Sequence, residues 1–200
     1  FYHLGAGKNV TRSNLAKANE KRNYRIFEEF AYHLIHEARR VTVTRDFDLN
    51  IKSNVYAFDS SIIDLCLSVF WWAEFRKTKG GVKIHTLFDV KTSIPSCIHI
   101  TKASVHDVNA LDLLKYESGG YYILDRGYTD FERLYKIHLH SAYFVTRTKS
   151  NLRFKRMYSG KVEKKSGVLS DQIGRLEGFY TSKSYPDKLR RIKYYDEENK

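Results

Sequence analysis

Two aspartates follow short apolar runs, and these two residues are best placed for chemistry. Asp59 comes directly after residues 55–58, and Asp125 comes directly after residues 121–124. A carboxylate at the end of a buried strand is costly unless it is paired or bound to a metal ion. Two such carboxylates on neighbouring strands can hold divalent cations between them, as two-metal phosphodiester cleavage requires. Ligands that offer only oxygen favour magnesium or manganese over zinc.

A simpler interpretation of the same residues is that both aspartates cap turns. Asp125 would then begin the turn that runs through Gly127. Aspartate is common in this role because its side chain accepts hydrogen bonds from the backbone two residues later. Spacing alone favours the capping interpretation and leaves the metal interpretation open.

The pattern of apolar residues predicts the elements that position these aspartates. Helical and alternating periodicities predict strands at 54–65, 82–88 and 94–100, a helix from Asp107 to Gly119-Gly120, a strand at 121–124 of the kind buried on both faces, a helix at 129–138 and a strand at 142–145. The first three strands form an antiparallel meander. The order predicts an α/β protein with a ribonuclease-H-like mixed five-stranded sheet over residues 51–149, although it does not exclude other α/β folds.

Residues 1–50 are predicted to form a helical segment that lies ahead of this sheet and contacts DNA. Ser13 is placed to cap a short helix, and Asn23 is placed to cap a longer one. Apolar residues recur at helical spacing between Tyr24 and Ala38, which predicts one face that packs on the rest of the protein. Residues 41–44 are β-branched and predict a short strand.

Residues 150–200 are predicted to begin a basic, strand-rich insertion. The short segments 178–181 and 191–195 both have strand-like composition. Basic residues gather in and just before the insertion, with Glu163 as the one acid among them: Arg147, Lys149, Arg153, Lys155, Arg156, Lys161, Lys164 and Lys165. A solvated face would explain such a run, but aromatic residues lie among these cations. The combination favours contact with DNA.

The composition agrees with a polyanionic partner. The chain has 35 Lys and Arg against 23 Asp and Glu, a formal net charge of +12 over 200 residues. A cation near a phosphate releases condensed counterions, so an excess of this size favours nucleic acid. Cys66 and Cys97 are too far apart for a zinc motif. Because we find neither a membrane-length apolar run nor a signal peptide, we predict a cytoplasmic protein.

Several ordered motifs resemble the DDE transposases of the insertion-sequence-four group. The resemblance extends over nearly the whole chain, and its similar blocks are residues 58–67, 72–85, 104–109 and 124–131, together with the N-terminal segments 2–5 and 15–22. The block at 58–67 resembles the surroundings of that family's first catalytic aspartate. The block at 124–131 resembles the surroundings of the second. The resemblance therefore favours the metal interpretation of Asp59 and Asp125.

The resemblance implies a DNA transposase that cleaves the ends of its element and joins them to target DNA. It implies a site of two Asp and one Glu that uses Mg²⁺, with Mn²⁺ as a substitute, and two ions in the complete enzyme. By residue, it makes Asp59 and Asp125 the catalytic metal ligands. It also implies double-stranded DNA as the partner and a homodimer on that DNA.

The third carboxylate has no counterpart in this sequence. In the family the Glu lies on a helix within a Tyr-Arg-Glu signature, after a β-rich insertion. Because the chain starts without Met and stops within the predicted insertion, we expect a fragment whose catalytic Glu lies beyond residue 200. Two alternatives stay open: a catalytically incomplete DNA-binding remnant, and a ribonuclease-H-like nuclease that cuts without joining.

Weaker candidates surround the two aspartates. Arg126 could hold a phosphate and Tyr128 could position DNA, although both could equally stabilise the turn. Arg147, Lys149, Arg153, Lys155 and Arg156 are predicted to contact DNA. Lys83 is a further weak candidate, and His85 and His106 could line the mouth of the site, although an ordinary polar role is favoured for both histidines. Trp71 and Trp72 are more typical of core packing than of base stacking.

Overall fold

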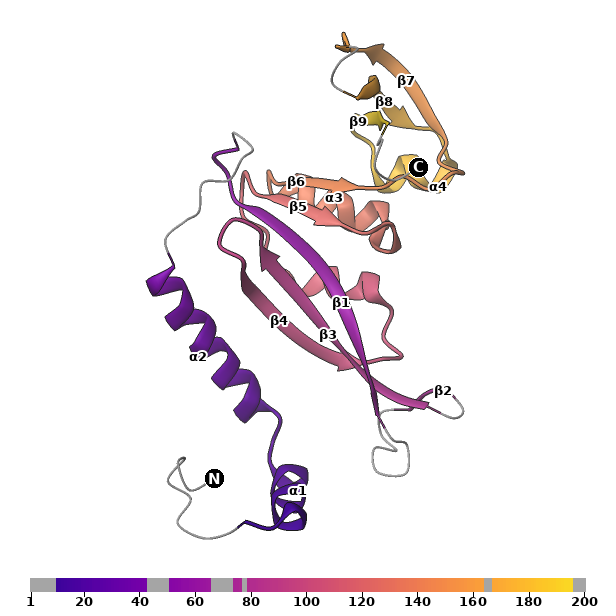
Figure 1. The fold of residues 1–200 in the computed structure, drawn as a ribbon. Coiled ribbons are helices and arrows are strands. Elements are labelled where there is room, and N and C mark those ends of the chain that lie inside the picture. Colours follow the sequence, from indigo (N-terminus) through magenta and orange to yellow (C-terminus); the bar gives the residue numbers. More distant parts are fainter. Residues whose placement is uncertain (1–9, 43–50, 66–73, 77–78, 164–166, 196–200) are drawn as a thin grey trace.

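A mixed sheet forms the centre of the protein (Figure 1). The computed structural model describes residues 10–42, 51–65, 74–76, 79–163 and 167–195. The sheet contains β1 (Val55–Leu65), β2 (Glu74–Arg76), β3 (Lys79–Asp89), β4 (Ile94–Lys102), β5 (Tyr121–Leu124) and β6 (Tyr143–Thr146). The connections hold the 3₁₀ helices η3 (Asp107–Leu113) and η4 (Arg126–Tyr128) and the helix α3 (Phe131–Leu139).

The strand order confirms the ribonuclease-H-like α/β arrangement predicted from the sequence. β3 pairs antiparallel with β1 and β4, whereas β5 pairs parallel with β1 and β6. The five strands therefore lie in the order β4–β3–β1–β5–β6, and the short β2 pairs with the start of β3. The parallel strands need crossover connections. α3 provides the crossover between β5 and β6.

One face of the sheet holds the hydrophobic core. Alternate residues of β1 and β5 point to this face, and α3 and η3 cover it with apolar side chains. The central members are Tyr56, Phe58, Leu111, Tyr122, Leu124, Leu134 and Ile137, all of them buried. Full burial of a large apolar side chain contributes about 1.5–3 kcal/mol. This packing therefore fixes β1 and β5 side by side.

The opposite face of β5 and β6 is open among the described residues. Ile123 of β5 and Tyr143 and Val145 of β6 are between 42% and 55% exposed. Burial alternates along Tyr121–Leu124. The prediction that this strand is buried on both faces is therefore wrong for the described structure, because α3 packs on one face only.

The segment after β4 differs from its predicted form. Residues 107–113 form the 3₁₀ helix η3 instead of an α-helix, and His106 caps it by accepting a hydrogen bond from the Val108 N–H (3.4 Å). Asp107, the residue at which the predicted helix begins, turns toward Lys83 and Ser60. Gly119 takes a positive φ of 77° before β5, a conformation that glycine adopts without strain.

The predicted N-terminal helices are α1 (Arg12–Lys21) and α2 (Arg25–Val41). Asn23 accepts a hydrogen bond from the Arg25 N–H (3.0 Å) at the start of α2. α2 lies along the outer strand β4, where the Tyr32 hydroxyl donates to the Ile98 carbonyl (2.7 Å) (Figure 1). Val41 ends α2, so the predicted strand at 41–44 does not begin there, and residues 43–44 lie outside the described residues. None of the described helices is long and apolar enough to cross a membrane.

The strand-rich character predicted for residues 150–200 is confirmed. β7 (Phe154–Ser159), β8 (Val168–Leu176) and β9 (Leu189–Tyr194) form a separate antiparallel sheet, and α4 (Phe179–Ser184) lies between β8 and β9. The prediction of a strand-like segment at 178–181 is wrong, since most of it belongs to α4. Leu176 and Tyr185 join the core of the central sheet. The small sheet is therefore docked on the central one.

Candidate active site

The structure brings Asp59 and Asp125 together on one face of the sheet. β1 and β5 run parallel with Ala57 opposite Ile123 and Phe58 opposite Leu124. Asp59 and Asp125 are the next residues along these two strands, and neighbouring strands lie about 4.8 Å apart. Asp59 comes two residues after Ala57, and Asp125 comes two residues after Ile123. Since side chains two residues apart point to the same face, both carboxylates leave the sheet on the face opposite the core. Two exposed carboxylates therefore lie side by side.

Asp59 lies inside β1, although an apolar run ends directly before it. β1 continues to Leu65 and stays paired with β3, whereas its pairing with β5 stops at Phe58. The site therefore forms where one neighbouring strand ends. Asp59 Oδ1 accepts a hydrogen bond from the Ser60 backbone N–H (2.8 Å).

Asp125 also performs the capping role that its spacing suggests. Its Oδ2 accepts a hydrogen bond from the Gly127 N–H (3.4 Å) at the start of η4. Its Oδ1 pairs with Arg147 Nη2 at 2.7 Å. This guanidinium, helped by the backbone N–H groups of Arg126 and Gly127, lowers the pKa of Asp125 to about 2. Asp125 is therefore ionised at neutral pH.

Arg147 owes its position to the register of β5 and β6. Leu124 lies opposite Thr146, so the residues that follow them, Asp125 and Arg147, are neighbours. Asp59, Asp125 and Arg147 thus form a row across three parallel strands. The row combines two anionic oxygen donors with a cation that can hold a phosphate.

The two aspartates have the chemistry of part of a magnesium or manganese site. Both are carboxylates, the ligand type that these ions prefer. Among the described residues, no group of three or more His, Cys, Asp or Glu is arranged to hold a metal ion. The described parts of the chain therefore offer two neighbouring carboxylates at this place and no arranged group of three.

Several weaker candidates lie under the sheet instead of at the mouth of the site. Tyr128 is buried with its ring edge-on to Phe58, 5.3 Å between centroids, and burial raises its pKa to about 12. Its position argues against direct contact with DNA. Lys83 and His85 are also buried. Burial lowers the pKa of His85, whose Nε2 lies 2.9 Å from Thr101 Oγ1.

Ser60, which sequence reasoning left out, follows Asp59 directly and contacts Asp107, a residue that the sequence placed only at the start of a helix. The Ser60 hydroxyl donates to Asp107 Oδ1 (2.8 Å), and Lys83 Nζ lies 3.0 Å from the same oxygen. Although burial raises the pKa of Asp107, these two contacts outweigh it and the pKa is lowered. The alternation of β1 could have placed Ser60 on the core face. Of the other candidates, Arg126 is exposed beside the site. Trp71 and Trp72 lie outside the described residues.

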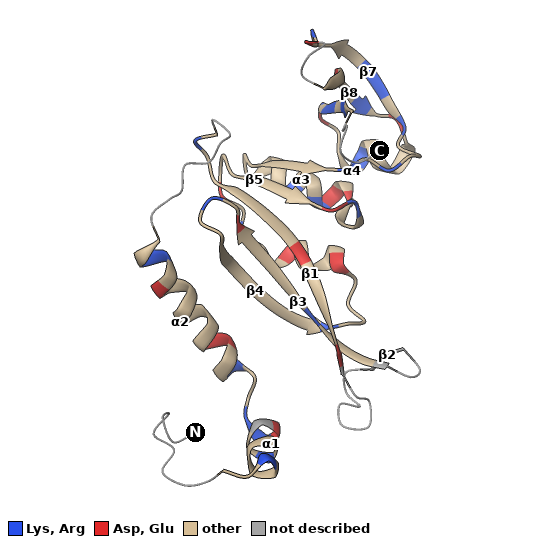
Figure 2. Ribbon diagram, in the orientation of Figure 1, with Lys and Arg blue, Asp and Glu red and all other residues tan. Residues whose placement is uncertain are grey.

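The predicted DNA-contacting residues are exposed on and before β7. Figure 2 shows Lys and Arg recurring along β7 and β8. Lys149, Arg153, Lys155 and Arg156 are all exposed, and within the described residues none of them pairs with a carboxylate. Lys155 lies directly opposite Arg175. Like charges directly opposite in a sheet are destabilising, so a polyanion on this face would relieve their repulsion.

Comparisons with known proteins agree with the geometry. Residues 51–198 match the family described as "Transposase DDE domain". The chain is also 30% identical over 182 residues to a protein of Sinorhizobium fredii (strain NBRC 101917 / NGR234) described as "Putative transposase y4zB". That alignment covers 89% of this chain and 49% of the relative, so the chain spans about half the relative's length. No solved structure matches the chain. Since the family match covers most of the sequence, the chain belongs to the family of transposases with a DDE domain.

Proposed function

We propose that this chain is part of a DNA transposase of the insertion-sequence-four type, which cleaves DNA at the ends of its element and joins them to target DNA. The observation that supports the proposal best is the placement of Asp59 and Asp125 on one face where β5 ends. Membership of the DDE family supports a shared role for these two carboxylates. The protein would use a pair of magnesium ions.

Each residue of the row has a distinct part in this proposal. Asp59 and Asp125 would hold the metal ions, which supply activation of the attacking oxygen and neutralisation of the leaving one. Arg147 would orient the scissile phosphate through its guanidinium, because it lies beside Asp125 and is largely exposed. The remaining ligand would be a glutamate outside this sequence. Two transposon ends joined in one event would require two copies of the protein.

A strand-joining assay tests the proposed reaction. The protein of the complete reading frame is incubated with element-end DNA and supercoiled target DNA, with Mg²⁺ or Mn²⁺ and with a chelator as control. We expect joined products only in the reactions that contain Mg²⁺ or Mn²⁺, and none in the reaction with the chelator. Cleaved but unjoined DNA would favour the nuclease alternative, and binding without cleavage would favour the DNA-binding remnant.

The basic strand β7 is expected to bind duplex DNA with strong salt dependence. If about six phosphates are neutralised, affinity should fall about a thousandfold or more between about 50 mM and about 200 mM salt. Lys155→Ala and Arg156→Ala should each reduce the slope by about one ion. Lys115→Ala, at an exposed lysine after η3, is the control and should leave the slope unchanged. Fluorescence anisotropy with a short duplex measures the slope, and an affinity that does not change with salt would contradict the assignment.

A further inference from the structure

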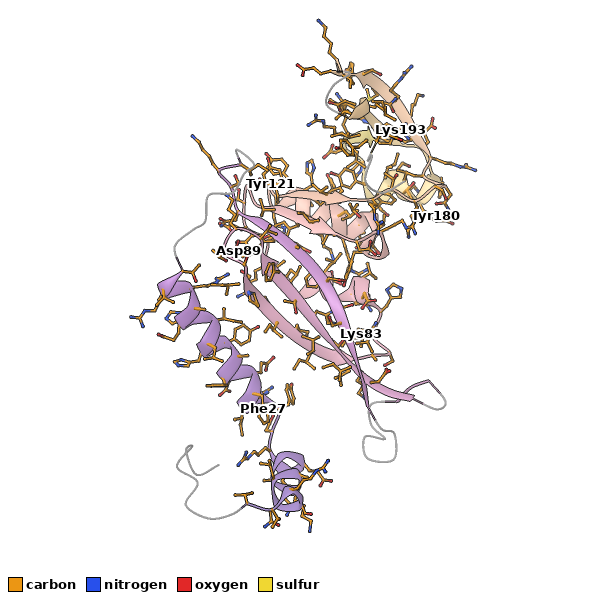
Figure 3. The ribbon with its side chains drawn as sticks, in the orientation of Figure 1. Phe27, Lys83, Asp89, Tyr121, Tyr180 and Lys193 are labelled. Atoms are coloured by element: carbon orange, nitrogen blue, oxygen red, sulfur yellow. The ribbon has the colours of Figure 1, made fainter. Side chains whose placement is uncertain are left out.

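A buried lysine lies beneath the candidate site on the other face of the sheet. Lys83 of β3 is 6% exposed (Figure 3). Its Nζ donates to the Val105 carbonyl (2.8 Å) and lies 3.0 Å from Asp107 Oδ1. Removing an ammonium group from water is costly unless it is paired and hydrogen-bonded. The ion pair with Asp107 meets that requirement, and it fixes the start of η3 against β3.

Asp107 connects this ion pair to β1. The Ser60 hydroxyl donates to Asp107 Oδ1 (2.8 Å), and the Ser60 backbone N–H donates to Asp59 Oδ1 (2.8 Å). Polar contacts therefore link Lys83 to Asp107 and Asp107 to the Ser60 side chain, and the backbone of the same serine holds the Asp59 carboxylate. Because Ser60 and Asp59 point to opposite faces of β1, the contacts of the Ser60 side chain lie on the side of β1 away from the proposed DNA.

The contacts occur where β1 loses a neighbour. Pairing with β5 ends at Phe58, and beyond this point β1 is held on that side by no described strand. β3 continues to pair with β1 through Ser60 opposite His85 and Ile62 opposite Lys83. A carboxylate at the open end of a pairing needs another support if it is to stay in one place. The Ser60–Asp107 contact supplies it.

We infer that Ser60, Asp107 and Lys83 form a positioning brace that holds the Asp59 carboxylate ready for a divalent cation. The inference rests on the proposed function, since it assumes that Asp59 binds metal. None of the three residues would touch the ion or the DNA. Outer partners of metal ligands fix the direction of the ligand, and their loss typically lowers metal affinity by about 10–100-fold.

The test compares two side chains of the same shape at position 60. Ser60→Thr keeps the hydroxyl, and Ser60→Val replaces it with a methyl group on an otherwise equal side chain. Mn²⁺ is titrated into the isotope-labelled chain, and the broadening of the amide signals of residues 58–61 and 124–127 reports site-specific binding. We expect Ser60→Val to weaken Mn²⁺ binding about tenfold or more. Ser60→Thr should stay close to the unmodified chain, and both variants should have similar unfolding midpoints.

A second pair of variants decides the question if Ser60→Val does not fold. Asp107→Ala removes the centre of the brace. Asp112→Ala removes another ion-paired aspartate of η3, one that contacts Arg133 (2.7 Å) and Lys136 (3.1 Å) instead. We expect Asp107→Ala to weaken Mn²⁺ binding and Asp112→Ala to leave it unchanged.

The outcomes separate the brace from the proposed function. Equal Mn²⁺ affinity of the valine and threonine variants, or of the two alanine variants, would overturn the brace while leaving the metal site intact. If Mn²⁺ broadens no signal near Asp59 and Asp125 in the unmodified chain, the metal site itself is wrong and the brace falls with it.

Discussion

Asp59→Ala and Asp125→Ala should each abolish the binding of Mn²⁺ that we expect this chain to show in calorimetry. The two carboxylates lie side by side where β5 ends, and each substitution removes one of the two oxygen ligands that we propose for the metal ions. The loss of outer partners alone lowers metal affinity by about 10–100-fold, so the loss of a ligand should lower it by at least about 100-fold. Because the pKa of Asp125 is about 2, its charge is present throughout the neutral range.

The matched control for these variants is Asp171→Ala. Asp171 is an ion-paired aspartate of β8, 2.8 Å from Arg190 Nη2, and it lies in the small sheet. The substitution Asp171→Ala should leave Mn²⁺ binding unchanged. Binding that survives both Asp59→Ala and Asp125→Ala would show that the metal site lies elsewhere. Loss in all three variants would point to a general effect on folding.

The position of the two aspartates could be predicted because strands obey a simple periodicity. Residues 55–58 and 121–124 are short apolar runs, and each is followed by an aspartate on the same side of its strand. Parallel neighbours with matching register place those aspartates together. The sequence alone shows the two apolar runs and shows which residues share a face of each strand. The sequence alone does not show the register between β1 and β5, because this register depends on how α3 and η3 pack on the two strands.

The surroundings of the aspartates could not be predicted for the same reason. Lys83 and His85 lie in the similar block at 72–85 and Tyr128 in the block at 124–131, which made all three weak candidates for the site. The structure buries them, because β3 alternates with its polar residues on the core side and η4 turns Tyr128 inward. Asp107 likewise suits a helix cap in sequence. Its ion pair with Lys83 is a tertiary contact, and it outweighs the local preference.

Tyr185 is the residue whose loss should most disturb the docking of the small sheet. It is 2% exposed and follows α4. Its ring packs edge-on against Tyr135 and Phe144, with centroids 5.1 and 6.0 Å away, and its hydroxyl lies 2.9 Å from His138 Nδ1. Replacing a buried aromatic residue with alanine typically costs about 3–5 kcal/mol, because contacts are lost and a cavity remains. We expect Tyr185→Ala to lower the free energy of unfolding in urea by that amount.

Tyr180→Ala is the matched control, since Tyr180 belongs to α4 itself but is 80% exposed (Figure 3). A surface substitution of this kind should change the free energy of unfolding by no more than about 0.5 kcal/mol. Tyr185→Phe keeps the ring and removes the hydroxyl, so it should cost about 1 kcal/mol, the usual net value of a hydrogen bond. This order of effects follows from burial and not from residue type. If Tyr185→Ala is as stable as Tyr180→Ala, the small sheet is not held on α3 and β6, and its basic strand β7 has no fixed position relative to Asp59 and Asp125.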